Sequence, residues 1–167
     1  ERPRPEPVPL PADPPVSPWA PPGPPPPEGR REVVAPLTLA AIVAVLDDRA
    51  DHYVVDANGI VHGRWGDALI QFIRLGERGE ILHVRTIAQR RLPVDRLTEA
   101  YEFCNSWNHD RLLPKAYVLR ADPDGLVLAG EVTTDLEHGV AQSQLTVLVT
   151  AALSTGAAFA AAVAALP

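Results

Sequence analysis

The segment LPVDRLTEAYEFCNSWNHDRLLPKAYV, residues 92–118, decides how the chain folds. Pro93 suits the first turn of a helix, and Asp95 would lie near the positive end of the helix dipole. Pro114 ends the turn that follows, and an extended run begins there. The segment therefore predicts a helix that joins one β-unit before it to a second β-unit after it. Its apolar stripe comprises Val94, Leu97, Ala100, Tyr101, Cys104 and Trp107.

The first β-unit contains the clearest hairpin signal of the chain. Asn58-Gly59 separates two runs rich in β-branched residues, and both turn residues tolerate positive φ. The strand expected at 68–75 is apolar on both faces, which indicates a central strand that helices cover on one side. A dimer partner could cover part of the other side. The strands of this unit are expected at 53–56, 60–65, 68–75 and 81–88.

The remaining elements complete an α+β pattern. Apolar residues at helical spacing predict a first helix in 36–48 with Thr38 as its N-cap. Two strands, 116–120 and 126–133, follow the central helix, with a turn at Asp122-Pro123-Asp124-Gly125 between them. A last helix runs from about residue 144 to 166. The order is α-β-β-β-β-α-β-β-α, an antiparallel sheet with helices packed on one face.

The composition divides the chain into two parts. Fourteen of the 19 prolines lie within the first 27 residues, so 1–35 is predicted to be a disordered proline-rich extension. The alternative is a ligand for an aromatic-lined groove, because Pro-x-x-Pro spacings surround Trp19. Residues 36–167 are enough for one globular domain and not for two.

Charge and cysteine content exclude some functions. The domain carries 11 basic and 16 acidic residues, which argues against a nucleic-acid binder. A single cysteine cannot form an internal disulfide, and no signal peptide is visible, so we expect a cytoplasmic protein. The last helix is uncharged and long enough to span a bilayer. Its alanine-rich composition and lack of flanking anchors make membrane insertion the less favoured interpretation.

No motif predicts catalysis, a cofactor or a metal. Phosphate-binding loops are missing from the sequence, and the five histidines share no ligand spacing. His62 and His83 could face each other across paired strands. Cys104 falls on an apolar helix stripe without an oxyanion-hole motif, so we interpret it as packing. The turn containing Asp122 and Asp124 lacks the other ligands of a calcium loop.

Two groups of residues are candidates for binding a partner protein. The first is a basic concentration at 85–96, which predicts either a solvated edge or a docking site for an acidic segment. The second follows the central helix, where asparagine and arginine side chains would bond the turn's backbone and Lys115 and Tyr117 would reach the surface. The candidates are Arg85, Arg90, Arg91, Asn105, Trp107, Asn108, Arg111, Lys115 and Tyr117.

Several short motifs carry a family resemblance. They are Trp65-x-Asp67-Ala68-Leu69-Ile70, Cys104-Asn105-x-Trp107-Asn108, Pro114-Lys115-Ala116-Tyr117 and Glu131-x-x-x-Asp135. In this order they resemble the YbjN domain family in its actinobacterial form, over about 37–166. The resemblance implies a fold like that of the type III secretion chaperones, which are small acidic α+β proteins, commonly dimers, that bind unfolded partner segments. It also implies a regulatory role, sometimes described as sensory transduction regulation.

Three functional hypotheses follow. The first is a cytoplasmic, chaperone-like or regulatory protein-binding module that forms a homodimer, without enzyme activity. The second is a small-ligand-binding domain or enzyme with a pocket near Trp107, for which His109, Asp110 and Arg111 would have to converge on a polar cleft. The third is a membrane-tethered adaptor that recruits partners through the proline-rich extension.

Overall fold

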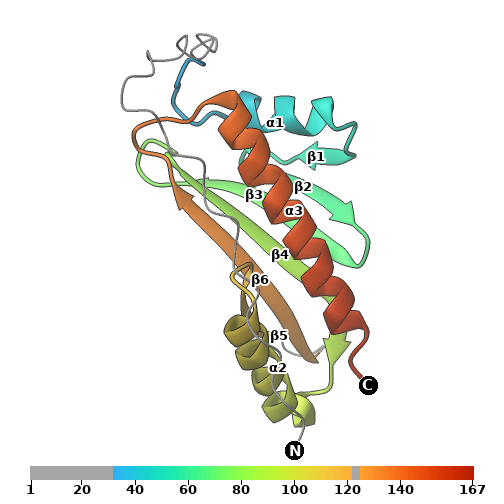
Figure 1. Cartoon of the computed structure of the whole chain (residues 1–167). Coiled ribbons are helices and arrows are strands. Elements are labelled where there is room, and N and C mark those ends of the chain that lie inside the picture. The colour runs from blue at the N-terminus through green and yellow to red at the C-terminus, as the bar shows by residue number, and fades with distance from the viewer. Residues whose placement is uncertain (1–31, 122–124) are drawn as a thin grey trace, which may run out of the picture. The chain divides into compact units, whose positions relative to one another are not determined.

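The computed structural model describes residues 32–121 and 125–167, and it confirms the predicted α+β architecture (Figure 1). Residues 1–31 of the predicted extension and the turn residues 122–124 lie outside the described residues, whereas 32–35 are described and Ala35 forms a β-bridge with Val140. A short 3-10 turn, η1, precedes the central helix. The elements are α1 (Leu39–Asp48), β1 (Tyr53–Val55), β2 (Val61–Trp65), β3 (Ala68–Leu75), β4 (Ile81–Leu92), η1 (Val94–Arg96), α2 (Leu97–Asp110), β5 (Lys115–Ala121), β6 (Gly125–Asp135) and α3 (Gln142–Ala164).

The six strands form one antiparallel sheet in the order β1-β2-β3-β4-β6-β5. The hairpin between β1 and β2 turns at Gly59, whose φ of 75° is open to glycine without strain. The carboxylate of Asp56 accepts the backbone N–H groups of Asn58 (2.8 Å) and Ile60 (3.0 Å), which fixes this turn. β3 is an interior strand, as its two apolar faces predicted.

α3 lies along one face of the sheet, where it contacts β3, β4 and β6 (Figure 1). Ala68, Ile70 and Phe72 of β3 point to this covered face and are almost completely buried. α3 passes close to the sheet at Gly156. A Cβ at that position would collide with Oγ1 of Thr86 and lie 3.1 Å from Cδ1 of Ile70. The helix therefore depends on a glycine at this crossing.

α2 joins the same layer through its aromatic residues. The ring of Trp107 is buried against Phe159 of α3, with a centroid distance of 5.3 Å and an angle of 77°. The Trp107 indole N–H donates to the carbonyl of Pro114 at 3.0 Å. Two residues of the predicted stripe are instead exposed, Val94 at 44% and Tyr101 at 52%. Val94 lies in η1, before the helical phase begins, and Tyr101 lies at the margin of the stripe.

Several elements are longer than the sequence pattern predicted. β4 continues to Leu92, past a register shift between Ile87 and Arg91. α1 begins as expected, because Oγ1 of Thr38 accepts the N–H of Ala41 at 3.1 Å.

Among the described residues, α3 is the helix long and apolar enough to cross a membrane. Eight of its residues are nonetheless buried in the domain: Leu145, Val149, Ala152, Leu153, Gly156, Phe159, Ala160 and Val163.

Candidate functional site

The face of the sheet opposite the helices carries a row with one residue from each strand, polar at every position except Val54 on β1. Residues in register on neighbouring strands share a face, so the pairing itself defines the row. Beside this row lie half-buried apolar side chains, among them Leu69, Ile73 and Ile87. We call this surface the uncovered face. From β1 to β5 the row consists of Val54, His62, Gln71, Arg85, Glu131 and Lys115.

Hydrogen bonds fix the β2 end of the row. Nε2 of His62 lies 3.0 Å from Oδ2 of Asp56, and its Nδ1 lies 3.1 Å from Nε2 of Gln71. The bond to His62 is the largest of the effects that lower the pKa of Asp56. An ionised carboxylate only accepts, so Nε2 of His62 donates to Asp56 and Nδ1 accepts from the Gln71 amide. The predicted pairing of His62 with His83 is wrong, because β3 separates β2 from β4.

Arg85 occupies the centre of the row. It lies between Gln71 and Glu131, and Glu131 forms an ion pair with Lys115 at 3.6 Å. Nε of Arg85 is buried and has no hydrogen-bond partner among the described residues. Tyr117, on β5, is half-buried, and this burial raises the pKa of its hydroxyl. The charge of Arg85 and a side-chain hydrogen bond with it oppose this rise in the pKa, and the charge of Glu131 adds to it.

His83 is the most deeply buried polar residue of the uncovered face, at 7% exposure. Its Nδ1 lies 2.8 Å from Oγ1 of Thr133 on β6. Its Nε2 is buried without a hydrogen-bond partner in the part of the chain that the structure describes. Burial, followed by the nearby charge of Arg85, lowers the pKa of His83, so the ring is neutral at pH 7. Two nitrogens of one strand thus lack partners on the same face.

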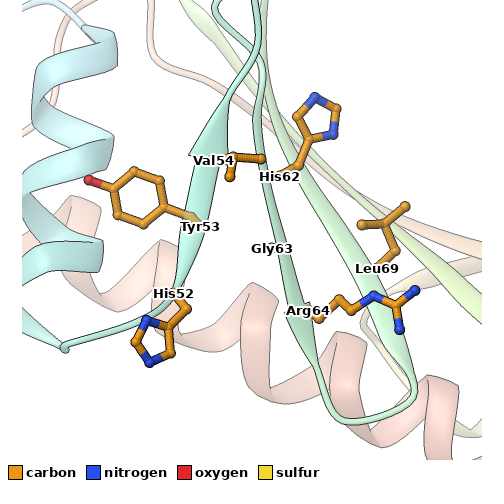
Figure 2. Close-up of a pocket in the computed structure, with 7 residues that line it drawn as sticks. All are labelled: His52, Tyr53, Val54, His62, Gly63, Arg64 and Leu69. Atoms are coloured by element: carbon orange, nitrogen blue, oxygen red, sulfur yellow. The ribbon is translucent and has the colours of Figure 1, made fainter.

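A hollow of about 350 Å³ opens at the β1 end of the uncovered face (Figure 2). Val54, which is 67% exposed, and Leu69 give it apolar walls. Figure 2 shows the Tyr53 ring directed toward α1, where its hydroxyl donates to Asp47 at 2.7 Å. Tyr53 therefore lines the hollow with its strand backbone and not with its ring. The residues that line the hollow are His52, Tyr53, Val54, His62, Gly63, Arg64 and Leu69.

The structure separates the basic residues that the sequence placed together. Arg85 lies on the uncovered face, as does Arg91 opposite Val127 of β6. Arg90 points to the other side and donates to the carbonyls of the last residues, including Ala164 at 2.9 Å and Pro167 at 2.7 Å. Arg96 donates to Glu99 and Pro167. Two of the four arginines therefore hold the end of the chain.

Asn108 lies in the last turn of α2 and bonds the backbone of β5, where a bond to the backbone of the following turn was predicted. Its Nδ2 donates to the carbonyl of Ala116 at 2.9 Å, and its Oδ1 accepts the N–H of Ala116 at 2.7 Å. β5 is an edge strand, so Asn108 occupies backbone groups that another strand could pair with. The Arg111 guanidinium lies 4.9 Å from the Trp107 ring centroid, whereas Asn105 is exposed.

Two smaller hollows border Trp107 and Arg111, of about 340 Å³ and 200 Å³. Asp110 lines one of them, and His109 lines neither. The predicted convergence of three polar residues is therefore not found there. The nine candidates divide into a sheet group (Arg85, Arg91, Lys115, Tyr117), a helix group (Asn105, Trp107, Asn108, Arg111) and Arg90, which holds the chain end.

His83, Gln71 and Glu131 are not among the binding residues that the sequence predicted. A signal was present, because strict alternation along residues 81–88 places His83 and Arg85 on one face between isoleucines. The residues of other strands that lie beside His83 and Arg85 depend on the register between strands, which the sequence does not give.

Cys104 is buried, and burial raises the pKa of its thiol to about 11. Residues 32–121 and 125–167 contain no group of three or more potential metal ligands.

Comparisons with known proteins place the chain in a family. A family model named YbjN, described as "Putative bacterial sensory transduction regulator", matches residues 38–165. The crystal structure of YbjN from E. coli superposes with a TM-score of 0.64 at 13% identity, covering 75% of this chain and 90% of that one. At that identity the likeness shows a common fold. A search of curated proteins finds no match. This chain belongs to the YbjN family.

Proposed function

We propose that this chain is a regulatory module without enzyme activity that binds a segment of a partner protein across the uncovered face. One observation carries the proposal. The face combines half-buried isoleucines with two buried nitrogens, on His83 and Arg85, that have no partner within the described residues. A solvated sheet face is normally polar at alternate positions, and apolar surface left outside the core is typical of interaction sites.

Two features support a binding role over catalysis. The thiol of Cys104, with its pKa of about 11, stays protonated at neutral pH and is a poor nucleophile. The family description names a regulator. The small-ligand alternative has less support, because the hollows near Trp107 lack the converging polar residues that it requires. We place the protein in the cytoplasm, with a protein partner and neither nucleic acid nor membrane as its target.

The test uses a charge placed on the uncovered face. Ile87→Lys introduces a lysine between Leu69 and Ala129, and the control Ser154→Lys places the same charge on the exposed side of α3. We expect affinity capture from the native host to retain a specific protein with the wild type and the control, and to lose it with Ile87→Lys. Retention of the same protein by the wild type, the control and Ile87→Lys alike would contradict the proposal.

A homodimer, expected from the sequence, is part of the same proposal. Sedimentation velocity at tens of micromolar, an order-of-magnitude choice for a weak interface, measures it directly. Including Ile87→Lys shows whether a second copy uses the uncovered face, because the variant would then sediment as a monomer. A wild type that sediments only as a monomer would argue against the dimer and leave the partner site intact.

A further inference from the structure

We infer that the segment bound on the uncovered face carries an aspartate or glutamate that Arg85 receives, beside an apolar residue that enters the hollow at Val54 and Leu69. The inference rests on the proposed function and names the chemistry of the partner. It follows from the charges of the row, from the atom of Arg85 that lacks a partner, and from the spacing of the hollow.

The charges of the row leave Arg85 as its central cation. At one end His62 bonds Asp56, and at the other Lys115 pairs with Glu131. These contacts engage both carboxylates that lie near the row. Glu131 is opposite Arg85 in register, yet no ion pair within 4.0 Å joins them among the described contacts. In a chain with net charge −6, this site is complementary to an added negative group.

The unpartnered atom favours a carboxylate in particular. Arginine binds a carboxylate through two parallel N–H groups, and a side-on pair uses Nε together with one terminal nitrogen. Nε of Arg85 is buried and has no acceptor in the part of the chain that the structure describes. A buried donor left without an acceptor destabilises the free protein. A bound carboxylate would remove that destabilisation.

His83 adds a second polar contact along the same strand. It lies two residues before Arg85, so the two side chains are about 7 Å apart on one face. Because Thr133 engages Nδ1, Nε2 is the ring nitrogen of His83 that remains for a hydrogen bond to the segment. The neutral ring adds no second positive charge, so it suits a backbone or hydroxyl group of the segment next to the acidic residue.

The hollow sets the position of an apolar neighbour. It lies around β2, two strands from β4, which corresponds to about 10 Å at 4.8 Å per strand. An extended chain covers that distance in about three residues. The preferred segment therefore carries an acidic residue and an apolar residue about three positions apart.

Peptide selection tests the inference. A phage library of random twelve-residue peptides is selected on the full-length protein, and the recovered peptides are synthesised and titrated against variants. We expect an acidic residue with an apolar residue near three positions away. Affinity should fall by about tenfold or more in Arg85→Gln, because a charged hydrogen bond contributes about 1.5–3 kcal/mol. Lys115→Gln, which removes a positive charge from the same row, should change it less than about threefold.

The outcomes separate the inference from the proposed function. Peptides that lose binding in Ile87→Lys but lack an acidic residue and bind Arg85→Gln unchanged would overturn the inference alone. A failure to recover any peptide sensitive to Ile87→Lys would overturn both. A wild-type dimer that Arg85→Gln dissociates would make a second copy the occupant and would also overturn the inference. Thermal unfolding of each variant verifies that it remains folded.

Discussion

The two faces of β3 differ in what covers them, although both are rich in apolar residues. Toward the helices, Ala68, Ile70 and Phe72 are 0%, 0% and 1% exposed. Toward the other side, Leu69, Gln71 and Ile73 are only partly buried. The covered face is closed by α3, whereas the uncovered face carries a polar row around Arg85. A helix of the same chain completes one face, and we propose that a partner completes the other.

The largest expected effect concerns the covered face. Trp107→Ala removes a buried ring that packs on Phe159 and a hydrogen bond to Pro114, so we expect a loss of about 3–5 kcal/mol in the free energy of unfolding. Urea denaturation measures it. Tyr101→Ala, on the exposed side of the same helix, is the control and should cost less than about 1 kcal/mol. Similar losses in both variants would show that α2 does not close this face.

The crossing of α3 over the sheet gives the next effect. Gly156→Ala places a methyl group against Thr86, and we expect a net destabilisation of about 1–3 kcal/mol despite the better helix propensity of alanine. Adding Thr86→Ala should recover part of it, because the two positions are in contact. A double variant no more stable than Gly156→Ala alone would contradict this explanation.

The edge of the sheet is expected to respond less. Asn108→Ala removes two hydrogen bonds to Ala116, so we expect a loss of about 1–2 kcal/mol. The freed edge of β5 should also increase self-association, which light scattering detects. The matched control is Asn105→Ala, an exposed asparagine of the same helix that should leave both properties unchanged. Equal behaviour of the two variants would argue against the edge role of Asn108.

The smallest effect tests the uncovered face through pH. The pKa of folded His83 lies below its usual 6.5, with Arg85 and Glu131 as the charges that act on it. Below pH 6.5 the unfolded chain therefore binds more protons, and stability falls as the pH decreases through the folded pKa. In His83→Gln this part of the loss between pH 7.5 and 5 should disappear, measured by urea midpoints. His138→Gln, an exposed histidine, should retain the wild-type slope.

Much of the site could not be read from the sequence. Trp107 was predicted to pack between helix and sheet, and it is buried against Phe159. Asn108 was predicted to bond the backbone of the turn, and it bonds Ala116 in β5, eight positions away. Arg90 and Arg96 were grouped with Arg85 because they are close in the chain. A strand sends alternate side chains to opposite faces, so Arg90 instead reaches the end of α3. His83 could not be recognised from the sequence, because the residue that engages its ring, Thr133, lies fifty positions away in the chain.

The sequence by itself determined the order and type of the elements. Helical and strand periodicity, the Asn58-Gly59 turn and the prolines that bound α2 are local signals, and they specify local structure. Only the tertiary structure decided which face of the sheet the helices cover. It also brought residues from six strands into the row around Arg85. The physical reason is that register and layer packing depend on contacts between distant segments, which neither propensity nor spacing encodes.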